Sequence, residues 1–170
     1  SSIPDMQERT IILDGFSKSY AMTGWRLGYG IFPEELVPHI VKLAVNSVSC
    51  AAPFTQKAAV AALEGPRDEV EAMVAEFGIR RRLIADGLQS IPGVNCPEPE
   101  GAFYAFPSIK ETGLTSIEFE TKAMNEAGVA LLSGSAFGEY GEGYVRLSYA
   151  NSQENIQKAI SQLDKMVRSL

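Results

Sequence analysis

Lys18 stands in an unusual sequence setting for a lysine. It lies between two short apolar runs, at residues 10–14 and 25–32, and small or hydroxyl-bearing residues surround it. If both runs are buried strands, desolvation favours the neutral, nucleophilic form of a lysine between them. A neutral amine can condense with an aldehyde and can also carry a proton. On residue type and spacing alone, a solvated surface lysine is the alternative.

Two arginines carry further possible chemistry. Arg26 follows Lys18 along the chain, and Arg146 alternates with Val145 and Leu147. A planar guanidinium can donate two parallel hydrogen bonds to a phosphate or a carboxylate. From the pattern alone, the alternatives are a strand-edge salt bridge for Arg26 and a solvent-facing position on an open sheet for Arg146.

The segment SKSYAMTGWRLGYG, residues 17–30, resembles the cofactor-lysine signature of the class I and II aminotransferases, which are fold-type I enzymes dependent on pyridoxal phosphate. The resemblance implies that Lys18 forms the Schiff base with the cofactor and later moves the substrate proton. It also implies that Arg26 binds the cofactor phosphate. The family often has a hydroxyl three residues before the lysine, where this chain has Gly15, so Ser17 is the hydroxyl expected to contact the phosphate.

Three later segments extend the resemblance. GAFYAF at residues 101–106 and SGSAFG at residues 133–138 are similar to segments that border the family's active site, with ordinary strand and turn residues as the alternative. YVRLSYA at residues 144–150 is similar to the strand whose arginine grips the α-carboxylate of the substrate. The resemblance therefore implies that Arg146 binds the substrate.

The elements before residue 65 must position Lys18 and Arg26. The two apolar runs predict strands, and Lys18 falls in the loop between them. Pro33, followed by two acidic residues, predicts the start of a helix. The buried face of that helix is predicted to contain Leu36, Ile40, Leu43 and Ala44. Pro53 predicts a second helix, through Leu63, which Gly65 and Pro66 end.

The later part of the chain has the pattern of a complete α+β domain. Apolar spacing predicts a long amphipathic helix up to about Ser90, and Thr115 with Glu118 forms a capping-box pair that opens another helix. A last helix begins near Ser152. Short strands are predicted at residues 102–106, 129–132 and 144–149.

The Gly65–Pro66 pair is the predicted domain boundary. Residues 1–65 are expected to be the end of the family's large, cofactor-binding α/β domain, and residues 66–170 its small C-terminal α+β domain with the long linking helix. In the family, the other cofactor ligands lie upstream of the lysine, whereas only 17 residues precede Lys18. We therefore expect the sequence to be the C-terminal part of a longer chain.

Composition argues against several classes of partner. The 15 basic and 21 acidic side chains give a net charge of −6 and are scattered, which argues against nucleic acid or a membrane as the partner. Two separated cysteines and one histidine argue against a metal site and against a disulfide framework. The absence of a long apolar segment or a basic, apolar start predicts a cytoplasmic protein.

The sequence thus predicts an aminotransferase that moves an amino group from an amino acid to a 2-oxo acid, with pyridoxal phosphate as cofactor and a homodimer as the expected assembly. One alternative is a folded fragment that packs or associates without catalysis. Another is a different fold-type I reaction, such as that of a lyase, decarboxylase or synthase. A transcription regulator would need a basic helix-turn-helix segment, which this sequence lacks.

Overall fold

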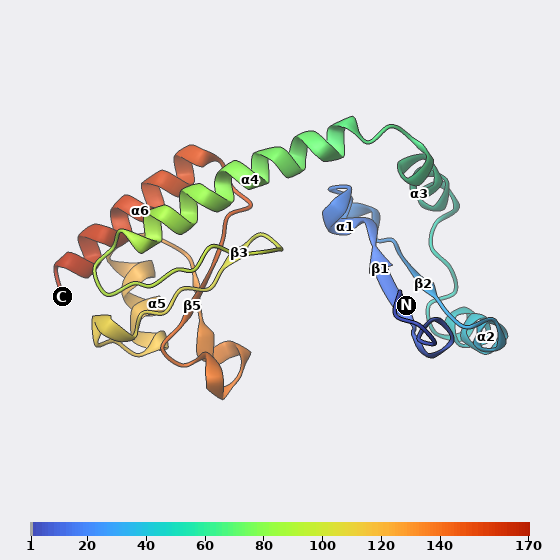
Figure 1. Ribbon diagram of the computed structural model, residues 1–170, viewed down its shortest axis with the longest axis horizontal. Coiled ribbons are helices and arrows are strands. Elements are labelled where there is room, and N and C mark those ends of the chain that lie inside the picture. The colour runs from blue at the N-terminus through green and yellow to red at the C-terminus, as the bar shows by residue number, and fades with distance from the viewer. Residues whose placement is uncertain (1) are drawn as a thin grey trace. The chain divides into compact units, whose positions relative to one another are not determined.

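The computed structural model describes residues 2–170, and the chain in it divides into two compact units (Figure 1). The first unit extends to Glu71, and the second comprises Ala72–Leu170. Each unit combines helices with short strands, so the mixed fold class that the sequence predicts is confirmed. Short 3-10 helices lie at Gln7–Arg9, Thr23–Trp25, Glu34–Leu36, Lys110–Thr112, Gly134–Phe137 and Glu139–Gly141.

A two-stranded hairpin forms the centre of the first unit. Strand β1, Ile12–Gly15, pairs antiparallel with β2, Gly28–Ile31. The predicted second strand began too early, at residue 25. Thr23–Trp25 instead form a 3-10 turn, and Arg26 has a left-handed backbone conformation that cannot continue a strand.

The expectation that the two strands are buried was wrong for the described chain. Leu13 in β1 is 74% exposed and Ile31 in β2 is 55% exposed. The two strands pair only with each other among the described residues. A two-stranded hairpin cannot cover its own apolar faces, because that requires a third strand or a packed helix.

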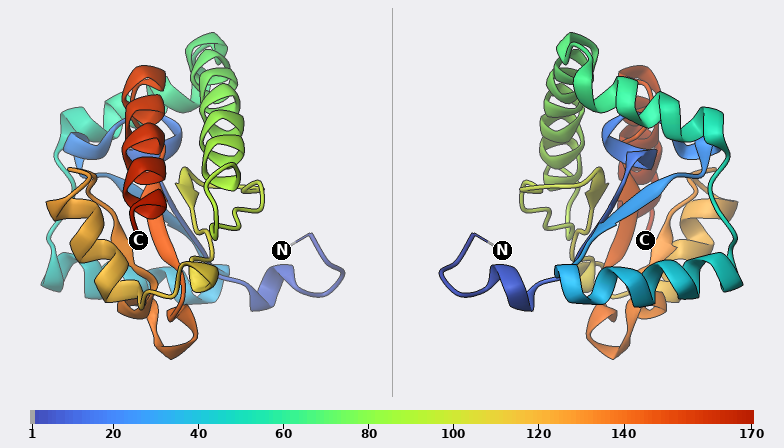
Figure 2. Two further views of the ribbon diagram at one scale, coloured as in Figure 1. Left: turned by 90° about the vertical axis from the view of Figure 1, so that its left-hand side faces the viewer. Right: turned by 90° about the vertical axis from the view of Figure 1, so that its right-hand side faces the viewer.

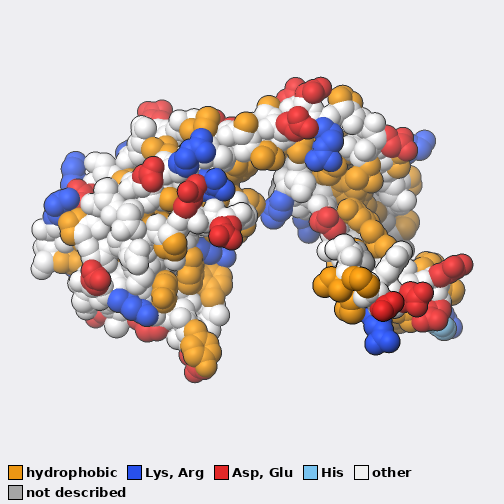
Figure 3. Space-filling view, viewed as in Figure 1, with side chains coloured by type: hydrophobic (Ala, Val, Ile, Leu, Met, Phe, Trp, Pro, Cys, Tyr) orange, Lys and Arg blue, Asp and Glu red, His pale blue; other side chains and the backbone are white. Residues whose placement is uncertain are grey.

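Two helices complete the first unit, α2 at Val37–Ser47 and α3 at Pro53–Glu64. The predicted buried face of α2 was wrong, because this helix has no buried residue and Leu43 is 66% exposed. The apolar stripe is present in the sequence, but no described element covers it. Apolar side chains are accordingly visible among the surface groups in Figure 3.

The core of the first unit is small. Its buried apolar residues are Phe16, Met22 and Ala59, with Ala59 contributed by α3. Partly buried side chains of Tyr20 and Leu27 pack against them. Through this cluster, the hairpin and the connection between its strands pack against α3.

The second unit is a three-stranded sheet with three helices, of which the first, α4, begins within the last residues of the first unit. The helices are α4 at Asp68–Gln89, α5 at Ser116–Asn125 and α6 at Gln153–Arg168. The strands are β3 at Tyr104–Ala105, β4 at Leu132–Ser133 and β5 at Val145–Ser148. Their order is β3-β5-β4 and both pairings are antiparallel.

Helices α4 and α6 lie side by side in the second unit (Figures 1 and 2). A Cβ added at Gly87 of α4 would lie 2.3 Å from the side chain of Ile160 in α6, so glycine permits the close approach. At the start of α6, Gln153 donates hydrogen bonds to both carboxylate oxygens of Glu76 in α4, at 3.1 Å each. These contacts join the two helices along their length.

One continuous core fills the second unit. Its buried members include Ile84 and Leu88 of α4, Phe119 of α5 and Leu163 of α6. Strand β5 turns Val145 and Leu147 toward this core. Because side chains alternate along a strand, Arg146 lies on the opposite face.

The predicted capping box is confirmed at the start of α5. The Thr115 hydroxyl accepts a hydrogen bond from the Glu118 backbone at 3.3 Å, and the Glu118 carboxylate accepts one from the Thr115 backbone at 2.9 Å. Ser152 caps α6, where its hydroxyl accepts from the backbone of Asn155. Both helix starts were therefore readable from residue type.

The predicted strand at residues 102–106 is shorter than expected. Ala102 has a φ of 58°, a left-handed conformation that breaks the extended chain before Tyr104. The hydroxyl of Tyr149 donates a hydrogen bond to the Ala102 carbonyl at 2.9 Å, which holds this turn against β5. Only Tyr104 and Ala105 join the sheet.

Among residues 2–170, no helix is both long and apolar enough to cross a membrane. The same described residues contain no group of three or more His, Cys, Asp or Glu side chains placed to hold a metal ion. Cys50 is a free, exposed thiol, and Cys96 is a free, buried one.

Candidate functional site

A single helical turn carries Lys18. Helix α1, Phe16–Ser19, follows β1 directly, so the predicted loop position of Lys18 is corrected to a short helix. The turn closes through a backbone hydrogen bond from Tyr20 to the Phe16 carbonyl at 3.2 Å. Four residues are too few for a helix to be stable by itself, so tertiary contacts must hold this turn.

Phe16 is the side chain that anchors this turn. It is only 2% exposed, and its ring centroid lies 5.5 Å from those of both Tyr20 and Tyr29. Its backbone N–H donates to the Leu27 carbonyl, which ties the start of α1 to the residue before β2. Buried Phe16 thus fixes a turn on which Lys18 is exposed and Ser17 is half-buried.

A carboxylate lies beside the same turn. Asp14, in β1, accepts a hydrogen bond from the hydroxyl of Tyr29 in β2 at 3.3 Å, and another from the Gly15 backbone at 2.7 Å. The negative charge of Asp14 raises the pKa of Tyr29, and burial and the hydrogen bond act in the same direction. The pair connects the two strands that flank the Lys18 turn.

Arg26 occupies a strained position at the other end of the connection. Its φ is 53° and its ψ is 52°, a left-handed conformation that is uncommon for a residue other than glycine. One terminal nitrogen, Nη1, donates to the Thr23 carbonyl at 3.0 Å. Arg26 also lines a cavity of about 640 Å³, together with Trp25, Cys50 and Thr55.

The donor set on this connection fits a phosphorylated aldehyde. Ser17, Lys18 and Arg26 supply a hydroxyl, an amine and a guanidinium from one stretch of chain between β1 and β2. A guanidinium and a hydroxyl suit a phosphate, and an amine suits an aldehyde. Sequence reasoning did not identify Asp14 or Tyr29, although Tyr29 lies within the recognised segment at residues 17–30 and Asp14 lies just before it.

Arg146 lies in the second unit, on β5. Its side chain is half-buried, and its guanidinium carbon Cζ lies over two rings, 4.4 Å from the centroid of Tyr104 and 4.5 Å from that of Phe137. The structure therefore places Ser17, Lys18 and Arg26 on one connection and Arg146 in the other unit. The two rings belong to GAFYAF and SGSAFG, the motifs already singled out, but their contact with Arg146 could not be read from spacing.

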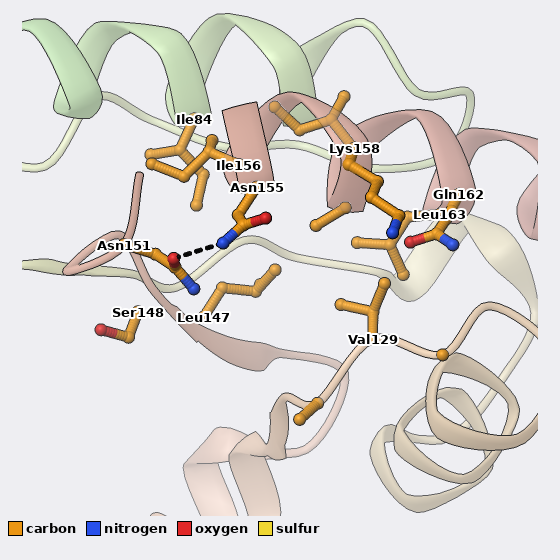
Figure 4. A pocket seen from close by; sticks show the side chains of 14 residues that line it. Ile84, Val129, Leu147, Ser148, Asn151, Asn155, Ile156, Lys158, Gln162 and Leu163 are labelled. Carbon is orange, nitrogen blue, oxygen red and sulfur yellow. Dashed lines mark hydrogen bonds between the residues drawn. The ribbon is translucent and has the colours of Figure 1, made fainter. Parts of the chain in front are cut away.

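A second cavity lies beside α6 (Figure 4). Its volume is about 310 Å³, and its lining combines aliphatic side chains such as Ile156 and Leu163 with polar ones such as Asn151, Asn155 and Lys158. Asn155 donates to Asn151 at 2.9 Å, so these two amides partly satisfy each other. None of the four candidate site residues lines this cavity.

Comparison with known proteins identifies the family. Residues 2–163 match the family model for aminotransferase class I and II. The chain therefore belongs to the class I and II aminotransferases, a family whose members use pyridoxal phosphate. The resemblance carried by the Lys18 segment is confirmed at the level of the family.

Several relatives are similar over nearly the whole chain. An aspartate aminotransferase of Pyrococcus abyssi is 45% identical over 99% of this chain, and an aromatic-amino-acid aminotransferase of Thermococcus litoralis is 44% identical over 99%. The solved structure of an aromatic aminotransferase from Pyrococcus horikoshii matches 99% of this chain with a TM-score of 0.94 and 42% identity.

The match covers only part of each relative. This chain spans 43% of the Pyrococcus abyssi and Thermococcus litoralis proteins and 45% of the Pyrococcus horikoshii structure. This stretch of sequence thus belongs to the family and spans less than half of each of these relatives.

Proposed function

We propose that the protein containing this sequence is a pyridoxal-phosphate-dependent aminotransferase in which Lys18 binds the cofactor covalently. The observation that carries the proposal is the placement of Ser17, Lys18 and Arg26 on one connection that a buried Phe16 anchors. Membership of the aminotransferase family supports the same assignment. In this proposal, residues 1–65 are the end of the large cofactor-binding domain and residues 66–170 form the small domain.

Each candidate residue has a distinct role. The amine of Lys18 would hold the cofactor through its aldehyde and, once the substrate amine has taken its place, would carry the proton that leaves the substrate Cα. The guanidinium of Arg26 holds the cofactor phosphate, and the Ser17 hydroxyl adds a hydrogen bond to it. When bound, pyridoxal phosphate supplies an aldehyde and a ring that withdraws electrons from the substrate.

Arg146 is proposed to bind the α-carboxylate of the substrate. A planar guanidinium matches the two oxygens of a carboxylate in a bidentate pair. This assignment favours an amino acid and a 2-oxo acid as the substrates, because both carry that carboxylate. It does not choose the side chain, since relatives named for aspartate and for aromatic amino acids are 45% and 44% identical to this chain.

Amino-group transfer by the whole protein tests the proposal. We expect transfer from at least one amino acid to 2-oxoglutarate, and we expect Lys18→Ala to abolish it. Arg146→Gln should raise KM for both substrates more than it lowers kcat, because the lost contact is made in the bound substrate as well as in the transition state. Amino-acid decarboxylation or elimination without transfer would instead identify another reaction of the same fold.

A second candidate applies to the 170-residue chain by itself, which would be a folded module without catalysis. The exposed apolar faces of β1, β2 and α2 favour it, because the first unit is incompletely covered in the described chain. Titration of the chain with pyridoxal phosphate distinguishes the candidates. A saturable adduct that borohydride traps on Lys18 would show that the chain still organises a cofactor site, and its absence would favour the module.

A homodimer is the proposed assembly of the whole protein, and the exposed apolar faces are surfaces that the rest of the protein or a second copy can cover. Sedimentation of the whole protein should show a dimer, and a monomer at micromolar concentration would contradict this proposal. The cytoplasmic location expected from the sequence stays a prediction.

A further inference from the structure

We propose that Tyr104 and Phe137 are positioning residues that hold the Arg146 guanidinium ready for a carboxylate. The inference rests on the proposed function, in which Arg146 binds the substrate, and it adds two residues that the resemblance does not assign. Neither ring is proposed to touch the reacting atoms. Their role is to restrict the conformations that Arg146 can adopt.

Two separate elements bring the rings to Arg146. Tyr104 comes from β3, where it pairs with Ser148 of β5, and Phe137 comes from the 3-10 helix that follows β4. The Cζ atom of Arg146 lies 4.4 Å from the Tyr104 centroid and 4.5 Å from the Phe137 centroid. Both distances lie well within the range in which a cation is attracted to the face of an aromatic ring.

Phe137 is itself held in place by other rings. Its centroid lies 6.1 Å from that of Phe106 in an edge-to-face arrangement, and Phe106 stacks on Tyr144 at 5.5 Å with an interplanar angle of 5°. Lys110 completes the row, with Nζ 4.8 Å from the Tyr144 centroid. Phe137 is 51% exposed, so these ring contacts fix its position more than burial does.

Ring contacts of this kind are compatible with carboxylate binding by the same guanidinium. A ring under the guanidinium interacts with its flat face, whereas a carboxylate binds in the plane of its N–H groups. The ion pairs of the described residues use Arg80, Arg81, Lys122 and Arg168 as their cations. Arg146 is thus placed by aromatic contacts in the described chain and not by an internal carboxylate.

Restricting the arginine before binding increases affinity. A flexible arginine loses rotamer freedom when it binds a ligand, and a side chain held in its bound conformation loses less. Removing one ring should therefore weaken carboxylate binding by about three- to tenfold, the range expected for a partly desolvated cation–π contact. The loss should appear in KM and less in kcat.

Arginine side-chain NMR of the 170-residue chain tests the positioning directly. Rotation about the Nε–Cζ bond of Arg146 should be slow in the native chain and at least about fivefold faster in Phe137→Leu and in Tyr104→Leu. Phe137→Tyr keeps a ring and should preserve slow rotation. Tyr140→Leu is the matched control, because Tyr140 lies in the same unit and is 91% exposed.

Each outcome of this experiment decides the point. Faster rotation in both leucine variants, with native rotation in Phe137→Tyr and Tyr140→Leu, supports the proposal. Equal rotation in all variants overturns it. Backbone amide spectra recorded on the same samples identify any variant that has unfolded, in which case Phe137→Ile and Tyr104→Met, which also remove the ring, replace it.

A titration separates this inference from the proposed function. With 2-oxoglutarate as the probe, the Arg146 side-chain signals of the whole protein should shift, and Phe137→Leu should raise the Kd about three- to tenfold while Phe137→Tyr does not. If the native Arg146 signals do not respond, the proposed substrate role fails and the positioning role fails with it. If they respond and Phe137→Leu binds as tightly as the native protein, only the positioning role is overturned.

Discussion

The two units of this chain bury their apolar side chains to different extents. The second unit encloses a continuous core that draws on α4, α5, α6 and β5, whereas the first, over residues 2–71, buries the apolar side chains of Phe16, Met22 and Ala59 alone. Large apolar groups of the first unit, such as Leu13 and Leu43, remain exposed at 74% and 66%. The comparison teaches that the proposed cofactor lysine lies on the less well-packed unit, and the proposed carboxylate-binding arginine on the better-packed one.

Replacing a buried leucine of the second unit and an exposed leucine of the first should give the largest difference between the two units. Leu163→Ala in α6, where the side chain is 1% exposed, should lower the free energy of unfolding of the second unit by about 2–5 kcal/mol. Leu43→Ala in α2 should change it by less than about 0.5 kcal/mol, because the side chain is already exposed. Urea denaturation, monitored by hydrogen exchange in each unit, measures the two changes in unfolding free energy. Equal destabilisation by the two substitutions would contradict the difference in packing.

The two cysteines offer a chemical comparison, with one thiol in each unit. Burial raises the pKa of Cys96 to about 11, whereas Cys50 is exposed. At pH 8, iodoacetamide should therefore modify Cys96 more slowly than Cys50 by about two orders of magnitude. Peptide mapping over time gives the two rates, and similar rates would show that the second unit opens readily.

The same thiol predicts a dependence of stability on pH. Because the pKa of Cys96 is raised in the folded chain, the folded state holds this proton more tightly than the unfolded chain does. The resulting stability is present below about pH 9 and is lost as pH rises toward about pH 11. Cys96→Ala should reduce this alkaline loss, and an unchanged slope between those pH values would count against a buried neutral thiol.

The capping box gives a smaller effect within the second unit. Thr115→Ala should lower its stability by about 1 kcal/mol, the usual cost of losing an N-cap side chain. Two hydrogen bonds lower the pKa of Glu118: the larger effect comes from the Thr115 backbone N–H, and a smaller one from the Thr115 hydroxyl. The stability from this pair should therefore be present above the unfolded pKa of about 4.3 and be lost as pH falls below it.

Two variants check the capping box. Glu118→Gln removes the titrating carboxylate, and it should flatten the acid-side loss of stability measured by urea denaturation. Thr121→Ala is the matched control, since Thr121 is an exposed residue of the same helix. If Thr121→Ala lowered stability as much as Thr115→Ala, the loss would come from replacing any threonine of this helix and not from losing the N-cap.

The smallest expected effect concerns the backbone near Lys18. Ala21 has a φ of 52°, and glycine adopts this conformation without the steric penalty of a Cβ atom. Ala21→Gly should stabilise the first unit by at most about 1 kcal/mol, because greater flexibility of the unfolded chain offsets part of the gain. Hydrogen exchange at residues 12–31 measures this gain in stability. The equivalent substitution in the second unit is Ala102→Gly, because Ala102 has a φ of 58°.

Local sequence signals predicted much of the fold. The capping box of α5, the Ser152 cap of α6 and the Pro53 start of α3 each depend on neighbouring residues, so they were readable. The helix start predicted at Pro33 was wrong for α2, because Pro33 precedes the 3-10 helix Glu34–Leu36 and α2 begins at Val37. The end of α3 at Glu64 followed from Gly65 and Pro66 in the same way. Such features require no knowledge of distant contacts.

Features set by distant or unusual backbone contacts were not readable. The exposure of the α2 stripe depends on what covers it, and the late start of β2 depends on the left-handed Arg26. The short β3 likewise follows from the left-handed Ala102. Similarity to a family indicated Lys18, Ser17, Arg26 and Arg146 as the candidate site, but the ring contacts of Arg146 emerged only from the three-dimensional arrangement.

Borohydride reduction of the whole protein loaded with pyridoxal phosphate tests the central claim most directly. Peptide mass mapping should find the phosphopyridoxyl group on Lys18, and Lys18→Ala should remove it without transferring it to another lysine. Lys57 of α3, an exposed lysine of the same unit, is the internal control. A stoichiometric adduct on Lys57 or any other lysine, with Lys18 unmodified, would contradict the account.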